Sequence, residues 1–220
     1  MGYTLNFSAV WRNFDHLLEG LGLSLMLAVA SILAGCIVGL VTAFMLQSRN
    51  RAFSGVARVY VTAIRNTPIL VLILFTYFAL PQMGLRLGKI ESFVLTLTVY
   101  AGAYLAEIFR SGLVSMPKGL REAGLAIGLT EFQTRTSIII PIMFRNVLPS
   151  LGSTLISLFK DTSLAAAIAV PELTFYARKI NNETFRVVET WIVASCLYVA
   201  TCTVLAALLR VVERRLTIAR

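Results

Sequence analysis

The sequence predicts an all-α integral membrane protein with five transmembrane helices and an amphipathic segment in front of them. Hydrophobic residues make up 57% of the 220 residues and charged residues only 14%. The mean hydropathy is +0.79. These values exclude an ordinary soluble domain. The apolar residues also fall into long runs separated by short polar stretches, as expected for helices that cross a bilayer.

The first two elements follow one another without a break. Over residues 7–21, apolar residues recur at three- and four-residue steps with polar residues between them. This pattern, with Trp11 and mixed charge, predicts an amphipathic helix in the membrane interface. The uncharged, apolar residues 21–46 predict the first span. Gly35 and Gly39 have a small-xxx-small spacing that permits close helix approach, although glycine is also simply frequent in membrane helices.

The second predicted span, residues 56–80, is interrupted by the polar step Arg65-Asn66-Thr67-Pro68. The apolar part that remains, residues 69–80, is too short to cross a bilayer. The polar step therefore lies at the cytoplasmic end of the span or inside the bundle, where a proline and polar side chains are tolerated only against protein or water.

Three further apolar runs, residues 93–109, 138–159 and 191–209, predict the remaining spans. Between the last two, residues 160–172 are expected to form a turn or a partial re-entrant segment on the outer side. The expected organisation is thus an amphipathic segment over residues 1–20, a five-helix membrane domain over 21–215 and a short cytoplasmic tail over 216–220.

A polar interruption over residues 117–141 separates the third and fourth spans. Helix-forming residues lead up to Gly128, which can adopt a positive φ and end a helix. Thr130 and Gln133 have the spacing of a capping box, which predicts that a second helix starts there and enters the bilayer. Two helices joined at Gly128 would form a protruding helical corner, here called the knuckle (residues 117–141), which can present one face to a partner.

The net charge of +9 does not indicate nucleic-acid binding, because the basic residues are scattered among apolar runs. Their distribution instead predicts orientation. If the chain starts outside, the inner segments hold twelve of the twenty basic residues and the outer segments six. The positive-inside rule then places the N-terminus outside, and the knuckle and the C-terminus in the cytoplasm.

The sequence offers no catalytic or metal-binding constellation. Cys36, Cys196 and Cys202 lie in apolar runs without metal-ligand spacing, and His16 is the sole histidine. The sequence contains no G-x-x-x-x-G-K-[ST] phosphate loop. We therefore expect no metal or cofactor in this chain and no enzymatic activity of its own.

Four motifs resemble one family. Glu122-Ala123-Gly124, followed by Gly128 and by Ile138-x-Ile140-Pro141, resembles the EAA loop of permease subunits of ATP-binding-cassette importers. The resemblance covers about residues 21–215, and it departs at Gly124 and Ile140, where the family usually has alanine and leucine. It is closest to the polar amino acid uptake branch, the permeases for histidine, arginine, glutamine and glutamate, through three further motifs: RNTP at 65–68, AYLAEIFRSGL at 103–113 and FKDTSL at 159–164.

This resemblance implies a type I importer fold in the inner membrane of a bacterial cell. The implied partners are a second permease subunit, identical or paralogous, two ATPase subunits that bind ATP and magnesium, and a periplasmic or surface solute-binding protein. The short helix of the EAA loop would dock into a groove of the ATPase. The residues implied in coupling are Arg121, Glu122, Ala123, Gly124 and Gly128. A channel or secondary transporter not driven by ATP is the alternative.

Candidates for contact with an amino acid substrate are the polar residues within the spans, because ionisable groups at such depth usually face a cavity. We favour Asp161 at the end of the fourth span, although it could instead cap the following turn or pair with Lys160. Glu107 is a second carboxylate, which could simply be neutralised by Arg110 three residues later. The full set is Asp161, Thr162, Ser163, Glu107, Asn66 and Thr67.

Overall fold

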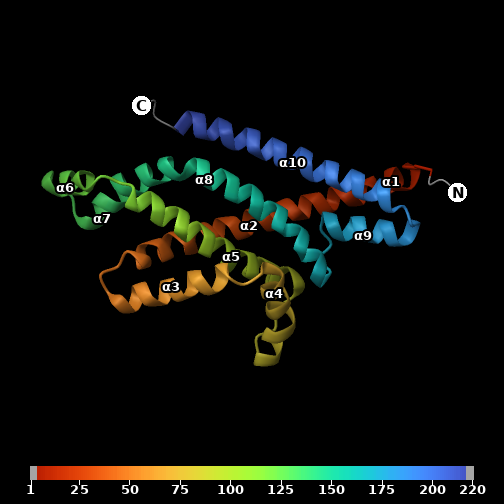
Figure 1. Ribbon diagram of the computed structural model, residues 1–220, viewed down its shortest axis with the longest axis horizontal. Helices are drawn as coiled ribbons and strands as arrows, with labels where there is room; N and C mark the ends of the chain where they lie inside the picture. Colours follow the sequence, from red (N-terminus) through yellow and green to blue (C-terminus); the bar gives the residue numbers. More distant parts are fainter. Residues whose placement is uncertain (1–3, 217–220) are drawn as a thin grey trace.

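The computed structural model describes residues 4–216, and within that range the chain consists of helices and the turns between them (Figure 1). The elements are α1 (Ser8–Arg12), α2 (Phe14–Leu46), α3 (Arg51–Arg65), α4 (Ile69–Leu74), η1 (Phe75–Ala79), η2 (Leu80–Met83), α5 (Lys89–Val114), α6 (Lys118–Ala126), α7 (Glu131–Thr134), η3 (Arg135–Ile139), α8 (Ile140–Asp161), η4 (Thr162–Ile168), α9 (Leu173–Thr184) and α10 (Val187–Leu216). Segments η1 and η3 are π-helical, and η2 and η4 are 3₁₀-helical. Of the predicted tail, residues 217–220 lie outside the described range.

The predicted all-helical membrane architecture is confirmed. Four helical stretches are long and apolar enough to cross a membrane: Phe14–Leu46, Lys89–Val114, Glu131–Ile168 and Val187–Arg215. A fifth span results if Arg51–Arg65 and Ile69–Met83, which are bent by 103° relative to one another, are counted as one. The second span, predicted over residues 56–80 with an interruption at 65–68, therefore consists of two helices. Pro68 cannot donate a helical hydrogen bond, and its ring disfavours a helical conformation at Thr67, so the chain turns there.

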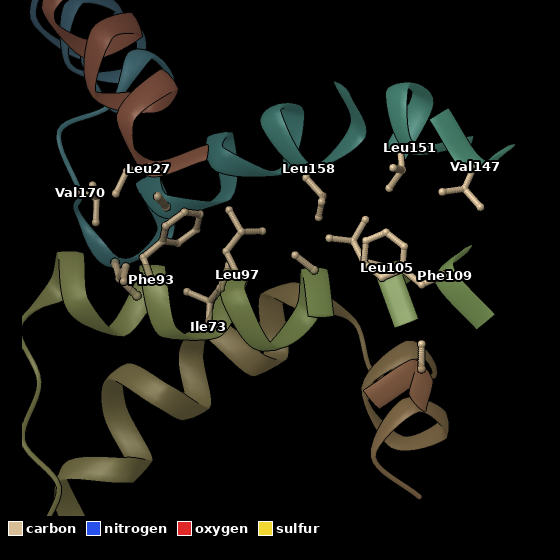
Figure 2. Close-up of a cluster of buried hydrophobic side chains, with 14 of the residues drawn as sticks. Leu27, Ile73, Phe93, Leu97, Leu105, Phe109, Val147, Leu151, Leu158 and Val170 are labelled. Atoms are coloured by element: carbon tan, nitrogen blue, oxygen red, sulfur yellow. The ribbon is translucent and has the colours of Figure 1, made fainter. Parts of the chain in front are cut away.

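The core forms where α5 packs along α2 on one side and α8 on the other (Figure 2). Phe93, Leu97, Leu105 and Phe109 follow one another along α5 and are fully buried. Side chains of α4 and α8 complete this cluster, so that the broken second span is anchored on α5 through Ile73. The glycine pair of the first span faces this contact, as its spacing permits.

The N-terminal amphipathic segment is helical and consists of two parts. Helix α1 ends at Arg12, and the rest of the segment continues as the first turns of α2. Its apolar residues Val10 and Leu17 are fully buried against α9 and α10. The hydrophobic periodicity indicated a buried face, and protein covers part of it, while Trp11 remains 58% exposed.

A buried carboxylate joins three elements near the N-terminal end of the molecule. Glu172 caps α9 through its own side chain, and its carboxylate oxygens accept hydrogen bonds from the backbone N–H groups of Thr174 (2.9 Å) and Phe175 (2.8 Å). Further hydrogen bonds come from the Tyr198 hydroxyl at 3.1 Å and the Ser24 hydroxyl at 3.3 Å. Burial raises the pKa of the Glu172 carboxyl to about 7, against the effect of these four hydrogen bonds. Glu172 thereby ties α9 to α2 and α10.

Different elements lie at the two ends of the molecule. The N-terminus, α1 and α9 lie at one end, while α6 and α7 lie at the other, toward which the C-terminal part of α10 also runs (Figure 1). This arrangement separates the knuckle from the N-terminus by the length of the spans.

Candidate functional site

The knuckle after α5 begins with a helix that ends as its sequence predicts. Gly128 has a φ of +86°. The N–H of Leu129 donates to the carbonyl of Gly124 at 3.1 Å, and the N–H of Gly128 donates to that of Leu125 at 3.0 Å. This pair of hydrogen bonds is a Schellman motif, which satisfies the last carbonyls of α6.

The predicted capping box after the corner is confirmed. The Gln133 N–H donates to the Thr130 hydroxyl at 3.2 Å, and the Thr130 N–H donates to the Gln133 side-chain oxygen at 2.9 Å. The new helix starts as α7 and widens into the π-helical η3 before it continues as α8. The corner is therefore fixed by local hydrogen bonds on both sides.

Gly124, one of the predicted coupling residues, is buried inside the knuckle. A β-carbon at this position would lie 2.6 Å from Cγ2 of Thr134 and 3.2 Å from Cδ1 of Ile138. The missing side chain therefore lets α6 pack closely against the start of the next helix. This contact explains why glycine suits the position where the resembling family usually has alanine.

The outer surface of the knuckle combines charge with exposed apolar side chains. Glu122 and Ala123 are exposed, and Ile127 and Phe132 are each 75% exposed. Arg121 forms an ion pair with Glu131 across the corner, so part of its bonding capacity is used within the chain. Because both side chains are about half exposed, this pair contributes little stability. Of the five predicted coupling residues, Arg121, Glu122 and Ala123 have exposed side chains, and that of Arg121 is paired with Glu131.

A polar cavity lies between α3 and α5. It has a volume of about 420 Å³, and its polar lining comes from Arg65, Asn66, Tyr104 and Glu107 together with Thr62. The guanidinium carbon of Arg65 lies 5.1 Å from the centroid of the Tyr104 ring, a cation–π distance. A smaller cavity of about 240 Å³ shares the wall formed by Glu107 and Thr62. This region therefore carries both signs of charge at the level of the broken second span.

The predicted pathway residues are only partly brought together. Asn66 and Glu107 line the same cavity. Glu107 is also held by Arg110, whose Nε and Nη2 donate to it at 3.0 and 2.7 Å, as the sequence alternative proposed. Thr67 and Thr162 instead use their hydroxyls on backbone carbonyls one helical turn earlier, those of Ala63 at 2.8 Å and Phe159 at 2.7 Å.

Asp161 lies at the end of α8 and is partly buried. Its carboxylate makes no capping hydrogen bond to η4, and it forms no ion pair within 4 Å among the described residues. The carboxylate therefore neither caps η4 nor forms a close ion pair with Lys160, although the charge of Lys160 acts on it. Ser163 follows Asp161 in η4. On α5, the hydroxyl of Tyr100 donates to that of Tyr104, which lines the cavity, at 3.2 Å.

Two residues of this cavity, and the buried Glu172 near the N-terminal end, were not among the predicted site residues. Arg65 adjoins Asn66 in sequence, and Tyr104 precedes Glu107 by three residues on α5, so a search for polar faces within spans would have found both. Glu172 carries no local signal beyond its place before α9. Within residues 4–216, no group of three or more His, Cys, Asp or Glu side chains could hold a metal ion.

A bundle of apolar helices with a polar cavity between α3 and α5 and a protruding helical knuckle is typical of a membrane transport subunit. The family of binding-protein-dependent transport system inner membrane components matches residues 31–218, and the chain belongs to this family. It is 38% identical over 215 residues to the glutamine transport system permease protein GlnP of Escherichia coli, with 97% of this chain and 98% of that protein covered.

Two further comparisons agree with this membership. The L-cystine transport system permease protein TcyB of Bacillus subtilis is 36% identical over 218 residues, covering 98% of this chain and 93% of that protein. A crystal structure of an amino acid ABC transporter with histidines superposes with a TM-score of 0.87 at 30% identity, covering 97% of this chain and all of that one. The predicted fold, that of a type I importer permease, is confirmed.

Proposed function

We propose that this chain is the permease subunit of an ATP-driven importer of a polar amino acid. The observation that carries the proposal is the 38% identity to a glutamine permease along nearly the whole chain. The knuckle geometry and the polar cavity support it, because they supply a docking face and a place for a zwitterionic solute. The alternative of an ATP-independent channel or secondary transporter has no support among the relatives.

In this proposal, ATP and magnesium are bound by two separate ATPase subunits, and the knuckle transmits their motion. A ligand-driven change requires contacts that differ between two states. Exposed Ala123, Ile127 and Phe132 offer an apolar face for such contacts, and Glu122 adds charge beside it. A second permease subunit, identical or paralogous, completes the pathway, and a periplasmic or surface binding protein delivers the amino acid to the opposite end.

The proposed orientation places the N-terminus outside and the knuckle in the cytoplasm of a bacterial cell, with the chain in the inner membrane. A cysteine introduced at exposed Glu131, in a chain whose three native cysteines are replaced, is expected to resist an impermeant thiol reagent in intact cells. A cysteine at exposed Asn182 on α9 is the matched control and is expected to react readily. The reverse labelling pattern would invert the topology.

Asp161 is the proposed contact for the cationic part of the substrate. Asp161→Asn keeps the shape of the side chain and removes its charge. A charge-assisted hydrogen bond contributes about 1.5–3 kcal/mol, so we expect uptake affinity to fall by roughly one to two orders of magnitude. The measurement is ATP-dependent uptake of a panel of polar amino acids into proteoliposomes that contain the permease, the ATPase and the binding protein.

Asp15→Asn serves as the control for this experiment, because Asp15 is an exposed carboxylate at the N-terminal end of α2. Its uptake is expected to equal that of the unmodified complex. Unchanged uptake by Asp161→Asn, with normal complex assembly, would remove Asp161 from the substrate site. Uptake of the preferred amino acid without ATP or without the ATPase would contradict the proposed function itself.

A further inference from the structure

A second, larger cavity lies beside the knuckle, away from the polar cavity of the proposed pathway. Its volume is about 630 Å³. It is lined by the C-terminal ends of α2 and α5, by η3, and by α6, which is the proposed coupling helix that contacts the ATPase. Its polar wall contains Arg49, Arg121 and Arg135, and its apolar wall includes Phe44, Leu113 and Ile139.

Positive charge dominates this cavity. Glu131 is paired with Arg121, and its Oε2 lies 3.9 Å from Nε of Arg135. Arg49 has no carboxylate oxygen within 4 Å in the described part of the chain. Glu122 also acts electrostatically on Arg121, so three guanidinium groups stand against two carboxylates, a balance that still favours an anionic ligand.

The arginines are held in different ways. Arg135 lies over the ring of Phe44, with its guanidinium carbon 5.7 Å from the ring centroid. This cation–π contact places the charge against the apolar wall of the cavity. Arg49 belongs to the loop after α2, so its side chain is free to approach a ligand from the other side. Guanidinium groups bind phosphate oxygens through paired hydrogen bonds.

The position of the cavity relative to the spans decides which anion is expected. Both α2 and α5 end at the cavity, where long apolar stretches give way to charged residues. This boundary is the level of the lipid head groups. Basic pockets between helices on the cytoplasmic side are suited to the head groups of anionic lipids.

We propose that this cavity binds the phosphate of an anionic phospholipid of the inner leaflet, with an acyl chain along Leu113 and Ile139. The leaflet assignment depends on the orientation proposed above. Because Arg121 lies on α6 and Arg135 on η3, the bound phosphate would bridge the coupling helix, the start of α8 and the end of α2. Anionic lipid would thereby stabilise the position of the coupling helix relative to the bundle.

The test measures lipid binding to the full-length chain in detergent by native mass spectrometry, with phosphatidylglycerol and phosphatidylcholine of equal acyl chains as probes. We expect phosphatidylglycerol to bind preferentially. Each basic residue near the site contributes about a fivefold factor in affinity for an anionic lipid. The double variant Arg49→Gln/Arg135→Gln is therefore expected to lose roughly 25-fold in phosphatidylglycerol affinity, with phosphatidylcholine binding unchanged.

Arg210→Gln/Arg214→Gln is the matched control, because it removes the same charge from the C-terminal part of α10, where neither residue lines the cavity. This variant is expected to bind phosphatidylglycerol as the unmodified chain does. If the first double variant does not accumulate, Arg49→Gln alone tests the same contact and is expected to lower the affinity about fivefold. Equal binding of the two lipids, or equal losses in both double variants, would overturn the proposal.

Two further measurements distinguish lipid binding from binding of a free phosphate compound and from a contact with another subunit. Soluble glycerol 1-phosphate is expected not to displace phosphatidylglycerol at millimolar concentration, and displacement would assign the cavity to a free phosphate compound. Unchanged lipid binding by Arg49→Gln/Arg135→Gln with loss of ATPase association would make the cavity a subunit contact. Lipid binding in detergent depends neither on the orientation of the chain nor on the transported solute. The lipid measurement therefore remains valid even if the proposed transport function is wrong.

Discussion

Replacement of Gly39 with leucine is expected to abolish the accumulation of the folded chain. A β-carbon at Gly39 would lie 2.9 Å from Cβ of Leu105 and 3.1 Å from the backbone nitrogen of Ala106. The obstructing atoms belong to or adjoin the helical backbone of α5, which cannot move without disturbing the buried row that contains Leu105. Overpacking a tight site costs about 1–3 kcal/mol, and a whole leucine side chain exceeds this range.

The size of the effect follows from the role of this contact. Helices in a bilayer associate chiefly by close packing, which depends on small residues at the interface. The α2–α5 contact carries the core of the fold. One turn earlier, a β-carbon at Gly35 would lie 2.7 Å from Cβ of Ala101. A loss of several kcal/mol is a large part of the stability of 5–15 kcal/mol that is typical of a folded protein.

Gly22→Leu is the control for this prediction, because Gly22 lies on the same helix and a β-carbon there meets no atom within 4 Å. Its membrane yield and thermal stability are expected to match those of the unmodified chain. Fluorescence-detected size-exclusion chromatography after heating compares the two variants. A monodisperse Gly39→Leu protein with unchanged thermal stability would mean that α2 and α5 do not approach as closely as described.

The parts of this fold that were predictable from sequence depend on local physical chemistry. Span positions follow from the length of apolar runs, and the helix stop at Gly128 and the capping box at Thr130 follow from backbone freedom and side-chain hydrogen bonds. Each of these features is decided within a few residues of sequence. They are also the features that the structure reproduces most closely.

The parts that differ depend on contacts between distant segments. Periodicity over residues 7–21 identified a face to be buried, but only the three-dimensional arrangement shows that α9 and α10 cover it. Pro68 indicated a break in the second span, but it did not indicate the size of the bend, 103°, or the packing of Ile73 into the core on α5. A hydrophobic pattern specifies how much surface is buried and leaves open which surface covers it.

The candidate site shows the same division. Asn66 and Glu107 are 41 positions apart and line one cavity because α3 packs on α5, whereas Thr162 is adjacent to Asp161 and turns its hydroxyl to the backbone. Polarity within a span thus picked out two residues that share a cavity, Asn66 and Glu107. The Thr162 hydroxyl is satisfied on an earlier carbonyl, as is common for threonine in a helix.

Gly128→Val is expected to yield an inserted permease that binds its ATPase subunits weakly. With a φ of +86°, Gly128 adopts a conformation that a β-branched residue tolerates poorly. A β-carbon there would meet no atom within 4 Å, so the effect is confined to backbone strain. Strain of about 1–3 kcal/mol corresponds to a loss of roughly five- to 150-fold in affinity if the knuckle must keep this corner to dock.

Two variants of the same knuckle separate backbone strain from the mere addition of a side chain. Gly119→Val adds the same side chain to α6 at a position that is also open, with an ordinary φ, and is expected to bind the ATPase normally. Gly128→Asn is expected to fall between Gly128→Val and the unmodified chain, because asparagine tolerates the left-handed conformation better than valine. The measurement is the Kd of the ATPase for permease in nanodiscs, together with substrate-stimulated ATP hydrolysis. If all three variants gave the same Kd and the same hydrolysis rate, the corner would not be part of the coupling contact, and the knuckle would serve only to connect α5 with α8.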